Sequence, residues 1–254
     1  MTNYALIFDT ETTSLAQPFC YDIGYCIIDM NSGLIVKQEH FIIEQIWHNF
    51  PLFESAYYKE KRPEYIKLMR AKKAILEKWG YACQTMARDI KNFQITDVYA
   101  YNSQFDDNVF NFNSEWYHTI NPIENVAIHD IWGYASQFIT FQNDYKIFCE
   151  INNLFNESGN YKGSAESVYQ FISNNPNFIE KHMGLYDSQI EAEILLFAIS
   201  NCGAEWAQDY PVTKILKREV AKPFTIKIDG KILYQGEYYK KIVKKDQFLF
   251  RTEV

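Results

Sequence analysis

The chain has 254 residues, 47% of them hydrophobic and 22% charged, which is enough apolar material for a core and excludes an intrinsically disordered chain. Only 10 Gly and 7 Pro accompany 19 Tyr and 19 Phe, so collagenous and low-complexity architectures are excluded as well. The net charge of −7 hides a partition: residues 59–91 carry ten Lys/Arg against four Asp/Glu, and residues 214–251 carry eleven against four.

The first 43 residues predict a meander of three strands. Residues 4–9 are continuously apolar up to a terminal acid, which is the pattern of a central strand whose carboxyl end meets solvent. A second strand is expected over 22–30. Asn31 to Gly33 then predicts a hairpin turn into a third strand over 34–43.

The next part of the chain predicts helices and a further strand. Helical spacing from 53 to 93, interrupted by Pro63 and Gly80, predicts two or three helices. A β-prone run over 98–101 precedes a helix that is expected over 106–116.

Beyond residue 120 the same alternation continues. A strand over 126–128 leads into an amphipathic helix that reaches Phe138, and Ser164 is the expected N-cap of a helix that reaches Ile172. The longest helical pattern covers 187–207. Strands that alternate with helices predict an α/β fold with a mixed sheet.

The C-terminal tail has a different character. Apolar and polar residues alternate over 224–228, and Asp229 with Gly230 predicts a hairpin turn, followed by another strand over 248–250. We therefore divide the chain into a main domain, 1–210, and a basic β-hairpin appendage, 211–254. The basic segments either hold a polyanion at the margins of an acidic body or are ordinary solvated faces.

Cysteine usage and hydropathy predict the environment of the protein. Five cysteines without a C-x-x-C pair favour reduced thiols over a disulfide or zinc framework. No apolar run approaches the roughly 18 residues that a membrane span needs, and the first residues show no secretion signal. We expect a cytoplasmic protein that does not associate with membranes.

Asp9 and Glu11 stand at the end of the first predicted strand. The period of two residues points both carboxylates to the same side of the strand. Two carboxylates at one place repel unless a cation compensates, and carboxylate oxygens suit Mg²⁺ or Mn²⁺. Because 13 Asp and 19 Glu produce about one D-x-E pattern by chance, the position of this pair carries the information.

Further acids follow at junctions of predicted elements. Asp106 opens a helix directly after a strand, where α/β sites gather, although capping the helix is the ordinary role of such an Asp. Asp107 would point about 100° away on that helix, so only one of the two faces a site. His182 precedes Asp187, which starts the longest predicted helix. Asp130 is expected to cap a helix.

With these motifs in this order, the sequence resembles the DEDD superfamily of 3′→5′ exonucleases, whose DnaQ-like members include the proofreading subunit of DNA polymerase III and ribonuclease T. Residues 8–13 (FDTETT) match the first motif, 102–106 (NSQFD) the second, and His182 with Asp187 the third. The histidine is typical of the DEDDh branch, since the tyrosine branch has Tyr at the place of Met183. The family commonly has Gly where this chain has Ser14, and often has His where it has Tyr101. The resemblance covers about residues 4–205 and implies a ribonuclease H-like sheet with flanking helices.

The resemblance also implies a set of functional residues. Asp9, Glu11, Asp106 and Asp187 would bind two divalent cations, Mg²⁺ or Mn²⁺, which clamp the attacking and leaving oxygens of a phosphodiester. His182 would take a proton from the attacking water. The implied substrate contacts are Thr10, Thr12, Leu15, Asn102 and Phe105. Leu15 and Phe105 would wedge or stack against terminal bases, although an aromatic at such a junction is more often part of the core.

We therefore expect a metal-dependent 3′→5′ exonuclease that acts on 3′ ends of single-stranded nucleic acid, DNA rather than RNA, and releases nucleoside 5′-monophosphates. Four alternatives stay open. They are a non-catalytic nucleic-acid-binding module on the same fold, a protein that docks to a polymerase or replication partner through the appendage, an RNA-directed exoribonuclease, and an endonuclease or transferase with the same carboxylates.

Overall fold

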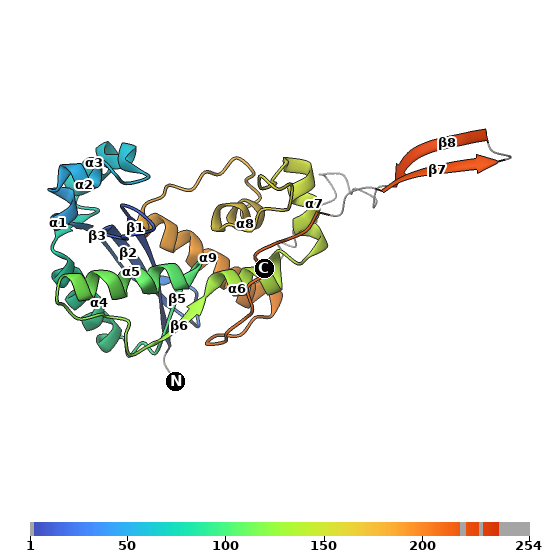
Figure 1. Cartoon of the computed structure of the whole chain (residues 1–254). Helices are drawn as coiled ribbons and strands as arrows, with labels where there is room; N and C mark the ends of the chain where they lie inside the picture. Colours follow the sequence, from blue (N-terminus) through green and yellow to red (C-terminus); the bar gives the residue numbers. More distant parts are fainter. Residues whose placement is uncertain (1–2, 219–221, 229–230, 239–254) are drawn as a thin grey trace.

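The computed structural model of the protein describes residues 3–218, 222–228 and 231–238. Its centre is a six-stranded sheet in the order β4-β3-β2-β1-β5-β6 (Figure 1). Strand β2 runs against its neighbours β1 and β3, whereas the other pairs are parallel. This arrangement is ribonuclease H-like, which confirms the predicted α/β class with a mixed sheet. The strands are β1 (Tyr4–Thr12), β2 (Cys20–Asp29), β3 (Ile35–Ile43), β4 (Ile75–Glu77), β5 (Asp97–Ala100) and β6 (Ala127–Asp130).

Strand β1 is buried on both faces, which explains its uninterrupted apolar sequence. Leu6 and Phe8 belong to one core, and Ala5 and Ile7 belong to the other. The first core is completed by α4 (Trp79–Asn92) and α5 (Ser103–Trp116). The second is completed by α6 (Ile131–Tyr134), a π-helical turn (Ala135–Ile139), α7 (Asn143–Asn152), α8 (Ala165–Ile172) and α9 (Gly184–Cys202). The sheet is therefore a middle layer between two groups of helices.

The chain between β3 and β4, residues 44–74, forms a small helical unit that we call the β3–β4 segment (Figure 1). It contains α1 (Glu44–Trp47), α2 (Phe50–Phe53), the 3₁₀ turn η1 (Lys59–Lys61) and α3 (Arg62–Arg70). Pro63 lies in the first turn of α3 rather than interrupting a helix, because the missing N–H has no intrahelical acceptor there. The short strand β4 was not predicted, since its three residues carry too weak a pattern.

Helix α9 begins in close contact with the sheet, and two glycines permit this contact. A Cβ atom on Gly24 of β2 would lie 1.8 Å from the backbone nitrogen of Leu185, and one on Gly184 would lie 2.9 Å from the backbone carbonyl oxygen of Asp9. Backbone therefore packs on backbone, which brings the first turn of α9 beside β1. The helix ends at Cys202, five residues before the predicted end, because Gly203 takes a left-handed conformation with φ 80°.

Two helix boundaries confirm the expected capping. Ser164 accepts a hydrogen bond from the Ser167 nitrogen and starts α8. Asp130 accepts one from the Trp132 nitrogen and starts α6. Helix α7 was not predicted, and α5 begins at Ser103, earlier than expected. Among the described residues, no helix is long and apolar enough to cross a membrane.

The chain stays on the body after residue 210 as far as Arg218. Leu216 is buried in the second core, and its carbonyl accepts a hydrogen bond from the Tyr161 nitrogen at 2.9 Å. Strands β7 (Lys222–Ile228) and β8 (Lys231–Tyr238) pair antiparallel in a separate two-stranded sheet, the expected hairpin. Its predicted turn at residues 229–230 and the strand expected over 248–250 lie outside the described residues.

Candidate active site

A cavity of about 800 Å³ opens where the carboxyl end of β1 meets the start of α9. The β3–β4 segment lines one part of it through Ser55, Tyr57 and Tyr58, and residues 163–165 at the start of α8 line another. Five carboxylates contribute to its lining: Asp9 and Glu11 from β1, Glu180 from the loop before α9, and Asp187 and Glu191 from α9. Sequence reasoning placed Asp9 and Glu11 at the strand end, and the strand in fact continues to Thr12.

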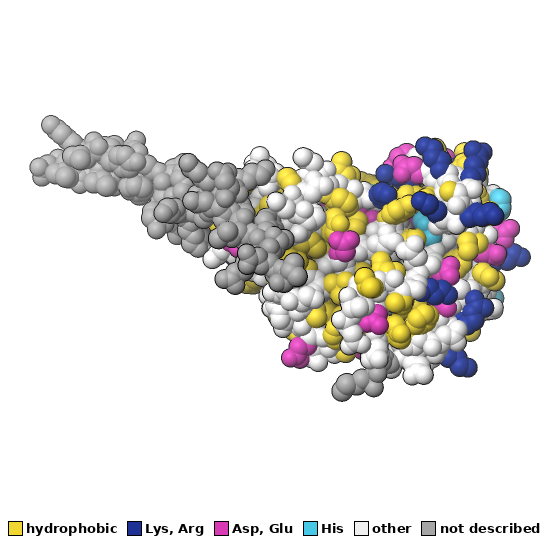
Figure 2. All heavy atoms as spheres, turned by 180° about the vertical axis from the view of Figure 1, so that it is seen from behind, with side chains coloured by type: hydrophobic (Ala, Val, Ile, Leu, Met, Phe, Trp, Pro, Cys, Tyr) yellow, Lys and Arg dark blue, Asp and Glu magenta, His cyan; other side chains and the backbone are white. Residues whose placement is uncertain are grey.

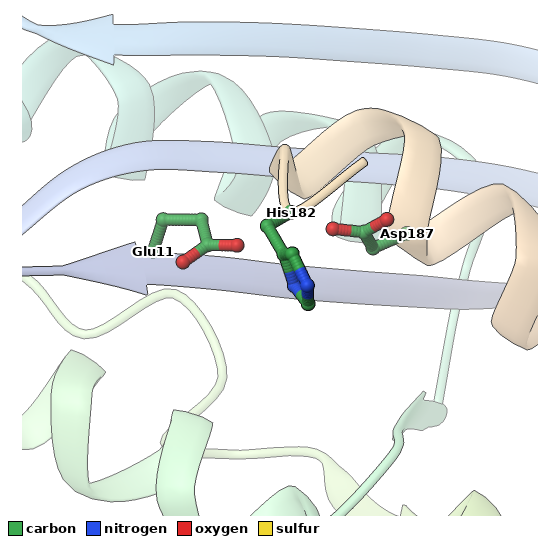
Figure 3. A group of neighbouring side chains, drawn as sticks. All are labelled: Glu11, His182 and Asp187. Carbon is green, nitrogen blue, oxygen red and sulfur yellow. The ribbon is translucent and has the colours of Figure 1, made fainter. Parts of the chain in front are cut away.

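Asp187 has one satisfied and one unsatisfied oxygen. Its Oδ2 accepts a hydrogen bond from the Met183 nitrogen at 2.6 Å, whereas the buried Oδ1 has no hydrogen-bond partner among the described residues. Figure 3 shows Glu11, His182 and Asp187 converging, and one ligand atom of each lies within 4.8 Å of the others. An unpartnered buried carboxylate oxygen beside a second carboxylate is the arrangement that a divalent cation stabilises.

Asp106 lies on α5 and is held by hydrogen bonds from Thr10 of β1. Its Oδ1 accepts hydrogen bonds from the Thr10 nitrogen at 3.0 Å and from the Thr10 hydroxyl at 2.6 Å, and the residue is 1% exposed. Asp107, the next residue, points elsewhere and accepts a hydrogen bond from the Asn111 side chain at 3.1 Å. The expected divergence of the two neighbours on the helix is therefore observed, and Asp106 is the one on the side of the cluster.

Burial, and after it the charges of neighbouring acids, raise the pKa values of these carboxyl groups. Burial, followed by the charges of Glu191 and Asp106, raises the pKa of Asp9 well above its ordinary value. Burial, followed by the charge of Asp187, does the same for the pKa of Glu11. Burial raises the pKa of Asp106 to about 7, and burial with the charge of Glu180 raises the pKa of Asp187 to about 8. Such a cluster resists ionisation until positive charge enters, and hard oxygen donors fit Mg²⁺ or Mn²⁺.

His182 lies beside the carboxylates in an unusual conformation. Its φ of 50° is left-handed, which is uncommon for a residue other than glycine. Its ring stacks on the ring of Tyr58, with centroids 4.0 Å apart and planes 7° apart. Burial lowers the pKa of His182 below its ordinary value of 6.5, so the imidazole is neutral at neutral pH and able to accept a proton.

The other residues predicted to contact substrate are distributed around the cavity, which all five of them line. Leu15 is 85% exposed there, whereas Phe105 is partly buried and also packs against the first core. Asn102 has φ 62° and donates its backbone N–H to Asp130 at 2.9 Å. The Thr12 hydroxyl donates to the Ser14 carbonyl at 3.3 Å. Thr10 is the buried partner of Asp106 described above.

Sequence reasoning missed several residues of the site. Glu191 follows Asp187 by one helical turn and therefore shares its face of α9, a spacing that was available in the sequence. Its Oε2 accepts a hydrogen bond from the Tyr101 nitrogen at 3.1 Å. Glu180 lines the cavity too, and Tyr58 had no motif that pointed to it.

A buried polar group connects β2, the β3–β4 segment and α9. The Asp22 Oδ2 accepts hydrogen bonds from the Tyr65 hydroxyl at 2.7 Å and from the Gly184 nitrogen at 3.0 Å. The His40 Nε2 lies 2.8 Å from the other oxygen of Asp22. Asp22 thus holds the first residue of α9, three positions before Asp187, and this role was not foreseen from the sequence.

No protein-family model matches the sequence, and no curated protein matches it. Among solved structures, the nuclease domain of 3′hExo, a DEDDh family member bound to rAMP, aligns with 80% of this chain and 96% of its own, at 12% identity and a TM-score of 0.49. A full-length 3′-exonuclease aligns over 85% and 91%, at 11% identity and a TM-score of 0.49. E. coli exonuclease I in complex with a dA16 oligonucleotide aligns over 77% of this chain and only 41% of its own, at 15% identity and a TM-score of 0.43. These similarities concern the backbone fold and not the activity of the protein.

Proposed function

We propose that the protein is a metal-dependent 3′→5′ exonuclease that removes nucleoside 5′-monophosphates from the 3′ end of single-stranded nucleic acid. The observation that carries the proposal is the buried, unpartnered Oδ1 of Asp187, which converges with Glu11 and His182 at an open cavity. If Asp187 had a purely structural role, this oxygen would be buried without a hydrogen-bond partner, at a cost in free energy. A bound cation would supply the missing partner.

Asp9, Glu11, Asp106 and Asp187 are the residues that would hold two divalent cations, Mg²⁺ or Mn²⁺. The bound ions would supply Lewis-acid stabilisation of the attacking and leaving oxygens in phosphodiester hydrolysis. Asp106 is fixed for this purpose by the two hydrogen bonds from Thr10, and Asp187 by the bond from Met183. These hydrogen bonds hold the carboxyl groups close together without a bound ion. The pKa values of the carboxyl groups are raised as a consequence of this burial and proximity.

His182 is the general base in this proposal. The neutral imidazole takes a proton from the attacking water as the oxygen bonds to phosphorus and the bond to the 3′ oxygen of the preceding nucleotide breaks. The leaving oxygen receives a proton from solvent, so atoms and charge balance. The carboxylates around the ring then stabilise the imidazolium that forms.

The cavity favours a chain end as the substrate. Its volume of about 800 Å³ lies within the range of pockets that enclose a small molecule, which is enough for terminal nucleotides and too little for a duplex. Leu15 and the partly buried Phe105 provide apolar contacts for terminal bases.

The test is digestion of single-stranded DNA and RNA oligonucleotides of equal sequence with Mn²⁺ or Mg²⁺, with the Asp187→Asn variant as the control. We expect a 5′-labelled strand to shorten stepwise from its 3′ end and to release 5′-monophosphates, and we expect a circular strand to persist. Cleavage of the circle would identify an endonuclease instead. Binding without shortening in either metal would identify a non-catalytic module.

A further inference from the structure

The β3–β4 segment reaches the candidate active site through two adjacent tyrosines. Tyr58 stacks on His182, and Tyr57 lines the same cavity while 83% of its surface is exposed. The two tyrosine rings meet edge to face with centroids 4.8 Å apart and an interplanar angle of 88°. Tyr58 therefore supports one side of the Tyr57 ring, and the rest of that ring stays open to solvent beside the carboxylates.

An exposed tyrosine at the mouth of a site suits a particular kind of ligand. Nucleobases stack on aromatic side chains whatever their sequence, since every base has a π-face. The ring of Tyr57 contributes little to the core, because most of it remains in contact with water. Its position at the mouth of the cavity thus favours a role in binding over a role in folding.

The charge of the segment continues this surface away from the cavity. Residues 59–73 carry seven Lys/Arg against two Asp/Glu. Arg62 is used internally, because its guanidinium lies 4.1 Å from the Trp47 ring centroid and donates to the Trp47 carbonyl. Four others are exposed and have no carboxylate within 4.0 Å in the described part of the chain: Lys67, Arg70, Lys72 and Lys73. Figure 2 shows Lys and Arg side chains gathered at this end of the molecule.

The exposed positive charges of the β3–β4 segment complement the acidic lining of the cavity. No Lys or Arg of the described residues lines the cavity, so positive charge enters it only with cations bound at the carboxylates. A strand that extends beyond the cavity therefore needs positive charge on its route, and α3 with the turn after it carries exposed Lys and Arg side chains on the same segment as Tyr57. Alternating stacking and phosphate contacts are how single strands are bound without sequence preference.

We propose that the β3–β4 segment binds the single strand upstream of the 3′-terminal nucleotides, with Tyr57 as a stacking platform and Lys67, Arg70, Lys72 and Lys73 as phosphate contacts. The proposal rests on the proposed function for the identity of the ligand. It adds the route of the strand and a reason for long substrates to bind more tightly than short ones.

Two kinds of variant test the proposal. Tyr57→Ala removes the platform and Tyr57→Phe keeps the ring. The fourfold charge reversal of Lys67, Arg70, Lys72 and Lys73 to Glu removes the positive charge that faces the phosphates. The matched control reverses Lys78 and Lys91, which are exposed at the two ends of α4 and do not line the cavity. All variants are surface changes, and circular dichroism checks that each one folds.

Binding is measured by fluorescence anisotropy of a labelled 20-nucleotide strand in the Asp187→Asn background, and turnover is measured on that strand and on a dinucleotide. We expect Tyr57→Ala to weaken binding roughly 5- to 150-fold, the range for removal of one stacked base, and Tyr57→Phe to restore it. The charge reversal should reduce the slope of log K against log salt by about 0.7 for each phosphate that the segment no longer neutralises. Dinucleotide turnover by the charge-reversal variant should stay within about two-fold of the α4 control, since none of its four residues lines the cavity and so short a substrate reaches the metal site alone.

The two proposals fail in different ways. If the wild type degrades both substrates and the charge reversal binds the long strand no more weakly than the α4 control, the segment is a solvated face and the inference is overturned. If the variants weaken binding as expected while no metal supports turnover, the β3–β4 segment binds single strands as proposed and the exonuclease proposal fails.

Discussion

Replacing Asp187 by asparagine should stabilise the metal-free protein, and the gain should grow with pH. The amide keeps an oxygen for the hydrogen bond from the Met183 nitrogen, 2.6 Å long in the wild type, and replaces the unpartnered Oδ1 with an uncharged group. The variant therefore replaces a carboxyl that must keep a proton to stay uncharged with a group that does not ionise, while leaving the backbone contact at the start of α9 in place.

The magnitude follows from the raised pKa of Asp187, about 8 in the folded protein against an ordinary value of 3.8. Between these values the folded chain keeps a proton on Asp187 that the unfolded chain has released. The free energy of unfolding therefore falls as pH rises, by about 1.4 kcal/mol per pH unit for each such carboxyl. For a chain of this size that corresponds to roughly 3–6 °C in Tm per pH unit.

The assay is thermal and urea unfolding followed by tryptophan fluorescence at pH 5, 6 and 7 with excess chelator. We expect the advantage of Asp187→Asn over wild type to increase by about 1.4 kcal/mol for each unit. Saturating Mn²⁺ should then stabilise the wild type more than the variant. Asp107→Asn is the matched control, because its carboxylate points away from the cluster toward Asn111. A parallel pH dependence of Asp187→Asn and wild type would refute the coupling of this charge to folding.

Four further changes have expected outcomes. His182→Ala should lower kcat by about 10²–10⁴ with Mn²⁺ affinity unchanged by calorimetry, and a collapse of that affinity would make His182 a ligand instead of the base. Tyr58→Ala should lower kcat about 2- to 10-fold because the stack on His182 is removed, and should alter the pH–rate profile, whereas Tyr58→Phe should behave as wild type. Thr10→Val removes the hydroxyl that holds Asp106 and should weaken Mn²⁺ binding about 10- to 100-fold in calorimetry, a role that unchanged affinity would exclude. Deletion of residues 222–254 should weaken binding of long strands and flatten its salt dependence while sparing dinucleotide turnover, and an unchanged salt slope would contradict a role of the tail in binding.

Local patterns determined much of the fold. The apolar run of β1 predicted a strand buried on both faces, because such a strand has no polar side to present. The turn at Asn31 to Gly33 and the caps at Ser164 and Asp130 were likewise predictable, since each depends on hydrogen bonds and backbone angles within a few residues. The alternation of strands and helices then limited the architecture to α/β.

The sequence also identified most of the acids around the cavity, through motif order and their places at element ends. Glu191 was available as well, one helical turn after Asp187. The positions of Asp9, Glu11 and Asp106 followed from the pattern because the parallel strands β1 and β5 carry their carboxyl ends to the same edge of the sheet. Their roles in catalysis remain proposals.

Only the tertiary structure decided which distant residues meet. Tyr58 stacks on His182, Asp22 accepts a hydrogen bond from the Gly184 nitrogen, and Leu216 packs in the second core. Each of these contacts joins segments from separate parts of the chain. No local pattern encodes such pairs, because each depends on how closely two elements approach, and here Gly24 and Gly184 set that approach for α9. The Oδ1 of Asp187 is likewise a product of packing, because the fold buries it where none of the described residues offers a donor.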